Sequence, residues 1–146
     1  LVSDSVQNWR AMWESGRRRI KEILYIDVNS VHFCDEEEKA RFEKLVKNCP
    51  ATVGQPSNLH YFRYYMENHI AQHPKVTTEP HMMVRLQPAT EHGLPIEIYC
   101  FSANTQWIPY EHLKAELVEF ALASLPVFGL KAFQSPTGKD ISQLSK

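Results

Sequence analysis

Two strand-like stretches on either side of a glycine turn constrain this chain more than any other feature. Before the turn at 91–93, every second residue across 82–86 is a large apolar one, and this period of two is typical of a strand. After the turn, residues 96–101 are rich in β-branched and aromatic side chains, which strands favour. Residues 81–103 are therefore predicted to form a long antiparallel hairpin.

An earlier segment, 20–28, shows the same period of two. Its β-branched residues predict a strand, and the charges of Lys21 and Asp27 mark the face that is turned to water. The opposite, apolar face consists of Ile20, Leu24, Ile26 and Val28. A last, short strand is predicted at 130–133, after a break at Gly129.

The acidic run 35–38 predicts the start of a helix. Asp35 is a suitable N-cap, and Glu38 stands three residues later, in the spacing of a capping box. Acidic side chains at this end also suit the positive pole of the helix dipole. Pro50 stops the helix, and residues 48–57 have the composition of a loop. The predicted apolar stripe of this helix consists of Phe42, Leu45 and Val46.

Two longer helices are predicted from apolar side chains at helical spacing. One extends from a cap at Asn58 to Pro74, and its apolar face consists of Leu59, Phe62, Met66 and Ile70. The other extends from about Pro109, a residue suited to a first helical position, to Leu125. Its buried side is predicted to consist of Leu113, Leu117, Phe120 and Ala121.

The order of these elements, β-α(α)-β-β-α-β, predicts the fold class. A four-stranded antiparallel sheet with the helices on one face is the natural way to bury these apolar faces. The chain is therefore expected to be an α+β protein, a ferredoxin-like split βαβ sandwich with an extra helix. Both βαβ crossovers are expected to be right-handed.

Composition excludes several classes of protein. The 146 residues have the length of one domain, and 16 basic against 17 acidic residues argue against a nucleic-acid-binding protein. Cysteines at 34, 49 and 100 form no CxxC pair and leave one over, which favours a reducing compartment. No stretch predicts a signal peptide or a transmembrane helix, so the polypeptide is expected to be soluble. Its start at Leu1 indicates an excised fragment.

No motif predicts a catalytic, cofactor or metal site. The phosphate and nucleophile signatures GxxxxGK[ST], GxGxxG and GxSxG are absent from the sequence. His69 and His73, at i and i+4, could face one metal ion, but no further ligand is close in sequence, and histidines at a helix C-terminus also interact well with its dipole. The run 35–38 lacks the spacing of a calcium loop, and the basic run 17–19 is interpreted as the start of a surface strand. The chain is therefore not expected to be an enzyme.

Several segments resemble one family, the small-conductance (MscS-type) mechanosensitive channels, and more closely its miniconductance branch. The resemblance covers nearly the whole chain in order, although the loop at 48–57 is shorter than in the miniconductance relatives. The similar segments are 2–10, 16–21 with 25–27, 62–65 with 73–74, 84–88 with 93–102, and 128–130 with 134–138.

The resemblance implies a cytoplasmic vestibule domain of a channel in the bacterial inner membrane. Residues 1–19 would be the tail of a preceding middle β domain, 20–136 the C-terminal α/β domain, and 137–146 a C-terminal tail. Identical subunits would form a homo-heptamer in the lipid bilayer, with these domains enclosing a hollow cage that filters solutes below the pore. No cofactor and no nucleic acid are implied.

Large aromatic residues near chain boundaries are candidate contacts between subunits, because such side chains often anchor interfaces. The candidate oligomer contacts are Trp9, Trp13 and Trp107, together with the tail from Thr137. A second hypothesis is a free-standing ferredoxin-like regulatory module that binds a small metabolite.

Overall fold

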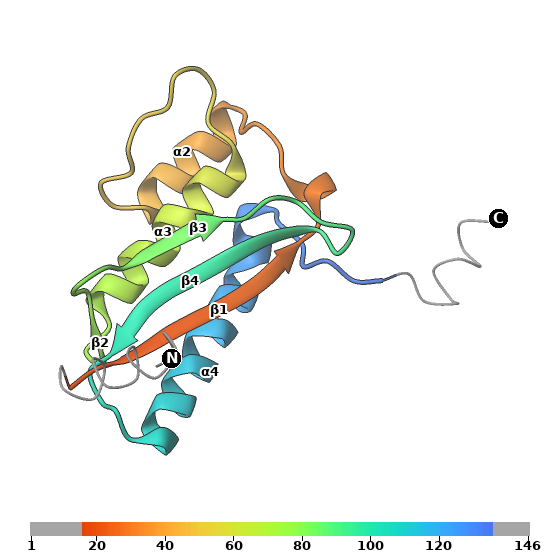
Figure 1. Cartoon of the computed structure of the whole chain (residues 1–146). Helices are drawn as coiled ribbons and strands as arrows, with labels where there is room; N and C mark the ends of the chain where they lie inside the picture. The colour runs from red at the N-terminus through yellow and green to blue at the C-terminus, as the bar shows by residue number, and fades with distance from the viewer. Residues whose placement is uncertain (1–15, 136–146) are drawn as a thin grey trace.

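β4 (Leu94–Ser102) is the central strand of the computed structural model, which describes residues 16–135. β1 (Arg18–Ile26) pairs with one side of β4 along its whole length. On the other side, β3 (Met83–Leu86) and the two-residue β2 (Val76–Thr77) pair with successive parts of β4. All pairings are antiparallel (Figure 1), which confirms the predicted hairpin and the predicted α+β class with a four-stranded antiparallel sheet.

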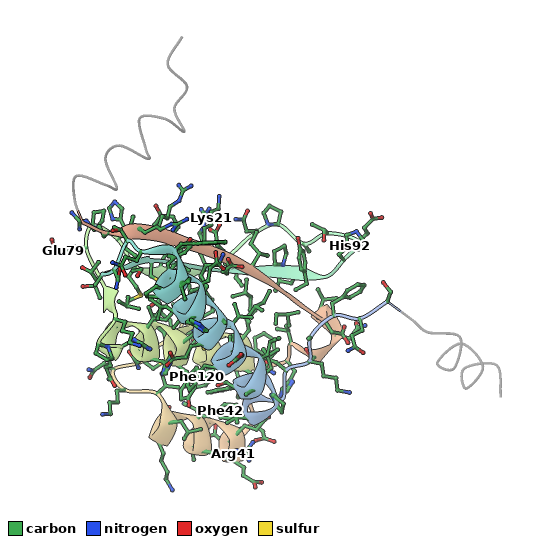
Figure 2. All side chains as sticks on the ribbon, turned by 90° about the horizontal axis from the view of Figure 1, so that it is seen from below. Lys21, Arg41, Phe42, Glu79, His92 and Phe120 are labelled. Carbon is green, nitrogen blue, oxygen red and sulfur yellow. The ribbon has the colours of Figure 1, made fainter. Side chains whose placement is uncertain are left out.

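Three α-helices cover one face of this sheet: α2 (Glu36–Leu45), α3 (Asn58–Gln72) and α4 (Trp107–Ser124). Figure 2 shows the sheet as one layer with the helices on one side of it and α2 farthest away. This arrangement is consistent with the ferredoxin-like split βαβ fold that the sequence predicts. Among residues 16–135, no helix lies over the opposite face of the sheet (Figure 2).

The core lies between the sheet and the helices. All four apolar residues predicted for α3 are buried, so that face is confirmed. Phe128, in the short 3₁₀ helix η2 (Leu125–Phe128), joins the helices, because its ring centroid lies 4.8 Å from that of Phe42 and 5.9 Å from that of Phe62. The sheet contributes the buried side chains Ile20, Leu24, Ile26, Ile96 and Ile98.

Two strand predictions are wrong at the end of the sheet. Val28 is exposed and lies in the 3₁₀ helix η1 (Val28–Ser30), because the Asp27 carboxylate accepts a hydrogen bond from Asn29 N at 3.0 Å and turns the chain. The segment 130–133 makes only an isolated bridge to Ile26, the last residue of β1, because on the side of Lys131 its partner is Asp27, which lies beyond the end of the strand. The fourth strand is instead β2, which the sequence did not predict.

The capping box of α2 is confirmed, since Glu38 N donates to Asp35 Oδ1 at 2.8 Å and Asp35 N donates to Glu38 Oε1 at 3.3 Å. Phe42 and Val46 are buried as predicted, but Leu45 is exposed. Because α2 packs mainly against α3 and not on the sheet, only a narrow strip of this helix is covered.

The N-cap of α3 is Ser57, whose hydroxyl accepts from His60 N at 3.1 Å, and not Asn58 as predicted. Asn58 is fully buried instead. Its Oδ1 accepts from His32 N at 3.0 Å, and its Nδ2 donates to the carbonyls of Ser30 at 3.0 Å and Phe128 at 2.9 Å. The Asn58 amide therefore connects the start of α3 both to the segment after β1 and to η2.

α4 begins at Trp107, two residues before the predicted Pro109. Its buried side is confirmed for Leu113, Leu117 and Ala121. Phe120 is only partly buried, because its ring lies in a stack with side chains of α3 at the edge of the core.

Candidate functional site

The uncovered face of the sheet has a buried carboxylate at its centre. Glu97 of β4 is opposite Ile23 of β1 and Arg85 of β3, and its side chain points away from the helices because it alternates with the core residues Ile96 and Ile98. Glu97 is nevertheless 0 % exposed. Side chains of the two neighbouring strands lie against it.

Two basic side chains flank this carboxylate, one from each neighbouring strand. Arg85 Nε donates a hydrogen bond to Glu97 Oε2, and Lys21 Nζ lies 3.6 Å from Glu97 Oε1. Both basic side chains stay about half exposed, so their charges face water on the open side of the sheet. Lys21 is seen on that side in Figure 2.

The electrostatics keep Glu97 ionised. Burial by itself raises the pKa of the carboxyl, but the hydrogen bond from Arg85 and the positive charges of Arg85 and Lys21 outweigh it. The pKa of Glu97 therefore lies below its ordinary value, and the three side chains form an ion triad across β1, β4 and β3.

Apolar side chains surround the triad. Ile23 and Tyr25, on the outward side of β1, are 40 % and 42 % exposed, which is high for large side chains in a sheet. Tyr99 and Phe101 of β4 pack edge to face, with ring centroids 5.7 Å apart. We define the open sheet face as Lys21, Ile23, Tyr25, Arg85, Glu97 and Tyr99. It combines exposed apolar side chains with an ion triad at its centre.

The basic run at 17–19 holds the start of β1 against α4. The Arg18 guanidinium lies 4.1 Å from the ring centroid of Tyr110, and the Tyr110 hydroxyl donates to the Arg19 carbonyl at 2.6 Å. Arg18 is the first residue of β1, so the interpretation of this run as the start of a surface strand is confirmed.

One predicted contact residue lies within the described part of the chain. Trp107 is 67 % exposed at the first position of α4, next to the similarly exposed Ile108, and its Nε1 donates to Glu111 Oε1 at 3.2 Å. Trp107 and the open sheet face lie in different parts of the molecule and do not form one patch. Trp9, Trp13 and the tail from Thr137 lie outside the described residues.

A cavity of about 530 Å³ lies beside Trp107, between the start of α4 and the loop after α3. Among the described residues of its lining Lys75 is the charged one, and Leu113 and Pro74 supply apolar surface. Its remaining polar lining comes from Ser102, Asn104, Thr105 and Gln106. The volume lies within the range of small-molecule sites, roughly 300–1,000 Å³.

The histidine pair on α3 has other partners than a metal. His73 Nε2 bonds to Glu116 Oε1 at 2.9 Å, and its Nδ1 accepts from Lys75 N at 3.1 Å, which occupies both ring nitrogens. The His69 ring stacks on Phe120 with centroids 3.5 Å apart, and burial, followed by the nearby His73, lowers the pKa of His69. Among residues 16–135, no group of three or more potential ligands is arranged to hold a metal ion.

Sequence reasoning missed a contact between Cys49 and His60, which are eleven positions apart. The Cys49 Sγ lies 3.4 Å from His60 Nε2 in a small pocket of about 170 Å³. The same Nε2 lies 2.8 Å from the Pro50 carbonyl, to which it can bond only as a donor, so it has no lone pair left to accept the thiol proton. Burial also raises the pKa of Cys49, which keeps the thiol protonated and a poor nucleophile.

No family model matches this chain. Within the described residues, none of the helices has the length and apolar character that a membrane span requires.

Proposed function

We propose that this chain is a wall domain of a homo-oligomeric, MscS-type mechanosensitive channel, in the vestibule on the cytoplasmic side of the bacterial inner membrane. Identical domains, seven in the complete ring, associate side by side and enclose the space below the pore. The domain itself performs no catalysis; it holds subunits in register and filters solutes.

The open sheet face is the observation that carries this proposal. A sheet face without a covering helix, with exposed Ile23 and Tyr25 around an ion triad, suits contact with another protein surface. Exposed Trp107 and Ile108 form a separate apolar patch at the start of α4. A wall domain that contacts a neighbour on each side requires a second contact surface besides the open sheet face.

The parent gene tests the proposal directly. Its coding sequence is expected to include hydrophobic spans of about 20 residues, and the parent protein in membrane patches is expected to give tension-activated currents. The purified parent protein is also expected to sediment as a homo-oligomer. A parent gene without membrane spans, or a monomeric parent protein, contradicts the proposal.

The cavity next to Lys75 favours a second candidate function, a regulatory module that binds a small anionic metabolite. Its volume suits such a ligand, and Lys75 supplies a positive charge in the lining. Thermal-shift screening against carboxylated and phosphorylated metabolites tests it. A stabiliser whose effect disappears in Lys75→Ala, but persists in the exposed control Lys131→Ala, favours the regulatory module; a parent protein with membrane spans and no stabiliser favours the channel.

A further inference from the structure

A further exposed apolar side chain lies outside the open sheet face. Phe33, between η1 and α2, is 69 % exposed although its backbone is fixed by a bridge to Ser57. The next residue is equally well held, because Cys34 N donates to the Pro56 carbonyl at 2.9 Å and its own carbonyl accepts from Gln55 Nε2 at 2.6 Å. The ring of Phe33 is thus presented to water by rigid backbone.

Acidic side chains follow Phe33 directly. Asp35, Glu36 and Glu37 are all exposed, and the capping box fixes the turn that carries them. We define the Phe33 ridge as Phe33, Asp35, Glu36 and Glu37. The ridge combines one exposed aromatic ring with three negative charges.

The open sheet face has the complementary composition. Lys21 and Arg85 outnumber Glu97, so the face has one positive charge in excess, and exposed Ile23 and Tyr25 lie beside these charges. Tyr25 and Ile23 offer apolar surface to a ring, while Lys21 and Arg85 offer donors to carboxylates. The two surfaces match in both apolar and charged character.

The ridge cannot reach the open sheet face of its own chain. Figure 2 shows α2 in the layer farthest from the sheet, with Arg41 on the other side of the helices from Lys21. The three carboxylates of the Phe33 ridge lie at the N-cap and in the first turn of α2, so the helical layers separate them from the open sheet face. Any contact between the two surfaces therefore joins two molecules.

We propose that the open sheet face of one copy binds the Phe33 ridge of a second copy. This contact deepens the proposed function and rests on it. Contacts between two unlike surfaces of identical chains close into rings when the rotation allows, whereas a face packed on the same face gives only a dimer. Self-pairing is disfavoured here because ridge against ridge would place three carboxylates opposite three others.

Pairwise cross-linking in the full-length parent protein tests this contact. Tyr25→Cys and Phe33→Cys subunits, each with Cys49→Ser to remove the half-buried thiol, are co-expressed with different mass tags and treated with a short bis-maleimide. Links between one Tyr25→Cys and one Phe33→Cys subunit are expected to exceed links between like subunits at least tenfold. Equal or greater linking of like subunits, or no linking within an intact oligomer, overturns the proposal.

A charge reversal on the Phe33 ridge provides a second test of the contact. Glu36→Arg with Glu37→Arg is expected to reduce unlike linking by about tenfold, as expected when like charges face each other across a contact. The matched control is Glu119→Arg, which reverses an exposed charge on α4 and is expected to leave linking unchanged. If both variants lower the yield alike, or neither does, the ridge is not the partner surface.

The size of the parent protein, measured by sedimentation before any cross-linking, distinguishes a failure of this contact from a failure of the proposed function. An intact homo-oligomer without the unlike link overturns this contact and leaves the proposed function standing. A monomeric parent protein contradicts both.

Discussion

Asn58 shows how one buried side chain can join three segments. It accepts from His32 N and donates to the carbonyls of Ser30 and Phe128 while being fully buried. A buried polar group that loses its partner keeps its desolvation cost, so His32 N and the Phe128 carbonyl depend on this amide, whereas the Ser30 carbonyl also lies 3.1 Å from His32 Nδ1.

Replacing Asn58 by alanine is expected to lower the free energy of unfolding by about 2–4 kcal/mol, because it leaves several buried backbone groups unpaired. Urea denaturation measures the change. The matched control is Asn68→Ala, which loses one exposed hydrogen bond to the Lys47 carbonyl and is expected to cost below about 1 kcal/mol. Equal losses in the two variants would show that Asn58 is not a structural tie.

Glu97 gives the chain a dependence on acid pH. Its pKa is lowered in the fold, so the unfolded chain binds the proton more readily, and the stabilisation is present above the ordinary pKa of 4.5 and lost as pH falls through the folded value. Glu97→Gln is expected to cost about 1–2 kcal/mol at pH 7, below the usual cost of breaking a buried pair because Lys21 and Arg85 are half exposed. It is also expected to flatten the acid limb of a plot of unfolding free energy against pH.

An exposed carboxylate provides the comparison. Glu119→Gln is expected to leave both the stability at pH 7 and the acid limb unchanged. If the acid limb is as steep in Glu97→Gln as in the unsubstituted chain, other carboxyl groups produce the loss of stability at acid pH.

The hairpin formed by β3 and β4 depends on one glycine in its turn. Gly93 has a φ of +97°, and a Cβ there would meet the Ile26 carbonyl oxygen at 2.6 Å and Phe133 Cβ at 3.0 Å. The turn is therefore pressed against the end of β1 and the segment that bridges to it. Both the backbone conformation and the close approach exclude a side chain.

Gly93→Ala is expected to lower the free energy of unfolding by about 2–3 kcal/mol, from left-handed strain and from the clash together. Gly54→Ala is the matched control, because Gly54 has a φ of +86° but no atom within 4 Å of a built Cβ. Gly54→Ala therefore measures the cost of the left-handed backbone conformation alone, which is expected to be about 1 kcal/mol. Thermal unfolding of both variants measures the difference, and equal losses would remove the argument from close approach.

The charges of the whole molecule nearly cancel, with 16 basic and 17 acidic residues, so association of copies is governed by where the charges lie. The open sheet face has a positive excess, and the Phe33 ridge is acidic and lies on the far side. In the proposed oligomer, such a molecule would present opposite charges to its two neighbours.

Salt is expected to weaken the proposed contact. Raising the ionic strength from about 0.01 M to 1 M shortens the screening length from about 30 Å to 3 Å, so the yield of unlike cross-links is expected to fall several-fold. The Glu36→Arg, Glu37→Arg variant is expected to lose this salt dependence. If the yield of unlike cross-links stays constant or rises with salt, apolar surface alone holds the two copies together.

The sequence by itself determined the elements whose formation depends on near neighbours. The capping box of α2, the apolar face of α3 and the alternation of the hairpin are set by side chains within a few positions of one another, and all three are present. The fold class follows from their order, because few arrangements bury those faces together. The resemblance to a channel family and the function that it implies stay predictions.

Tertiary structure decided everything that depends on residues far apart in the chain. Glu97 is polar and alternates as a surface residue does, yet it is covered because β1 and β3 bring Lys21 and Arg85 beside it. β2 forms only because β4 offers an edge, and the segment 130–133 bridges β1 only at its last residue, Ile26. Burial and pairing are properties of surfaces assembled from distant segments, and no local pattern encodes which segments will meet.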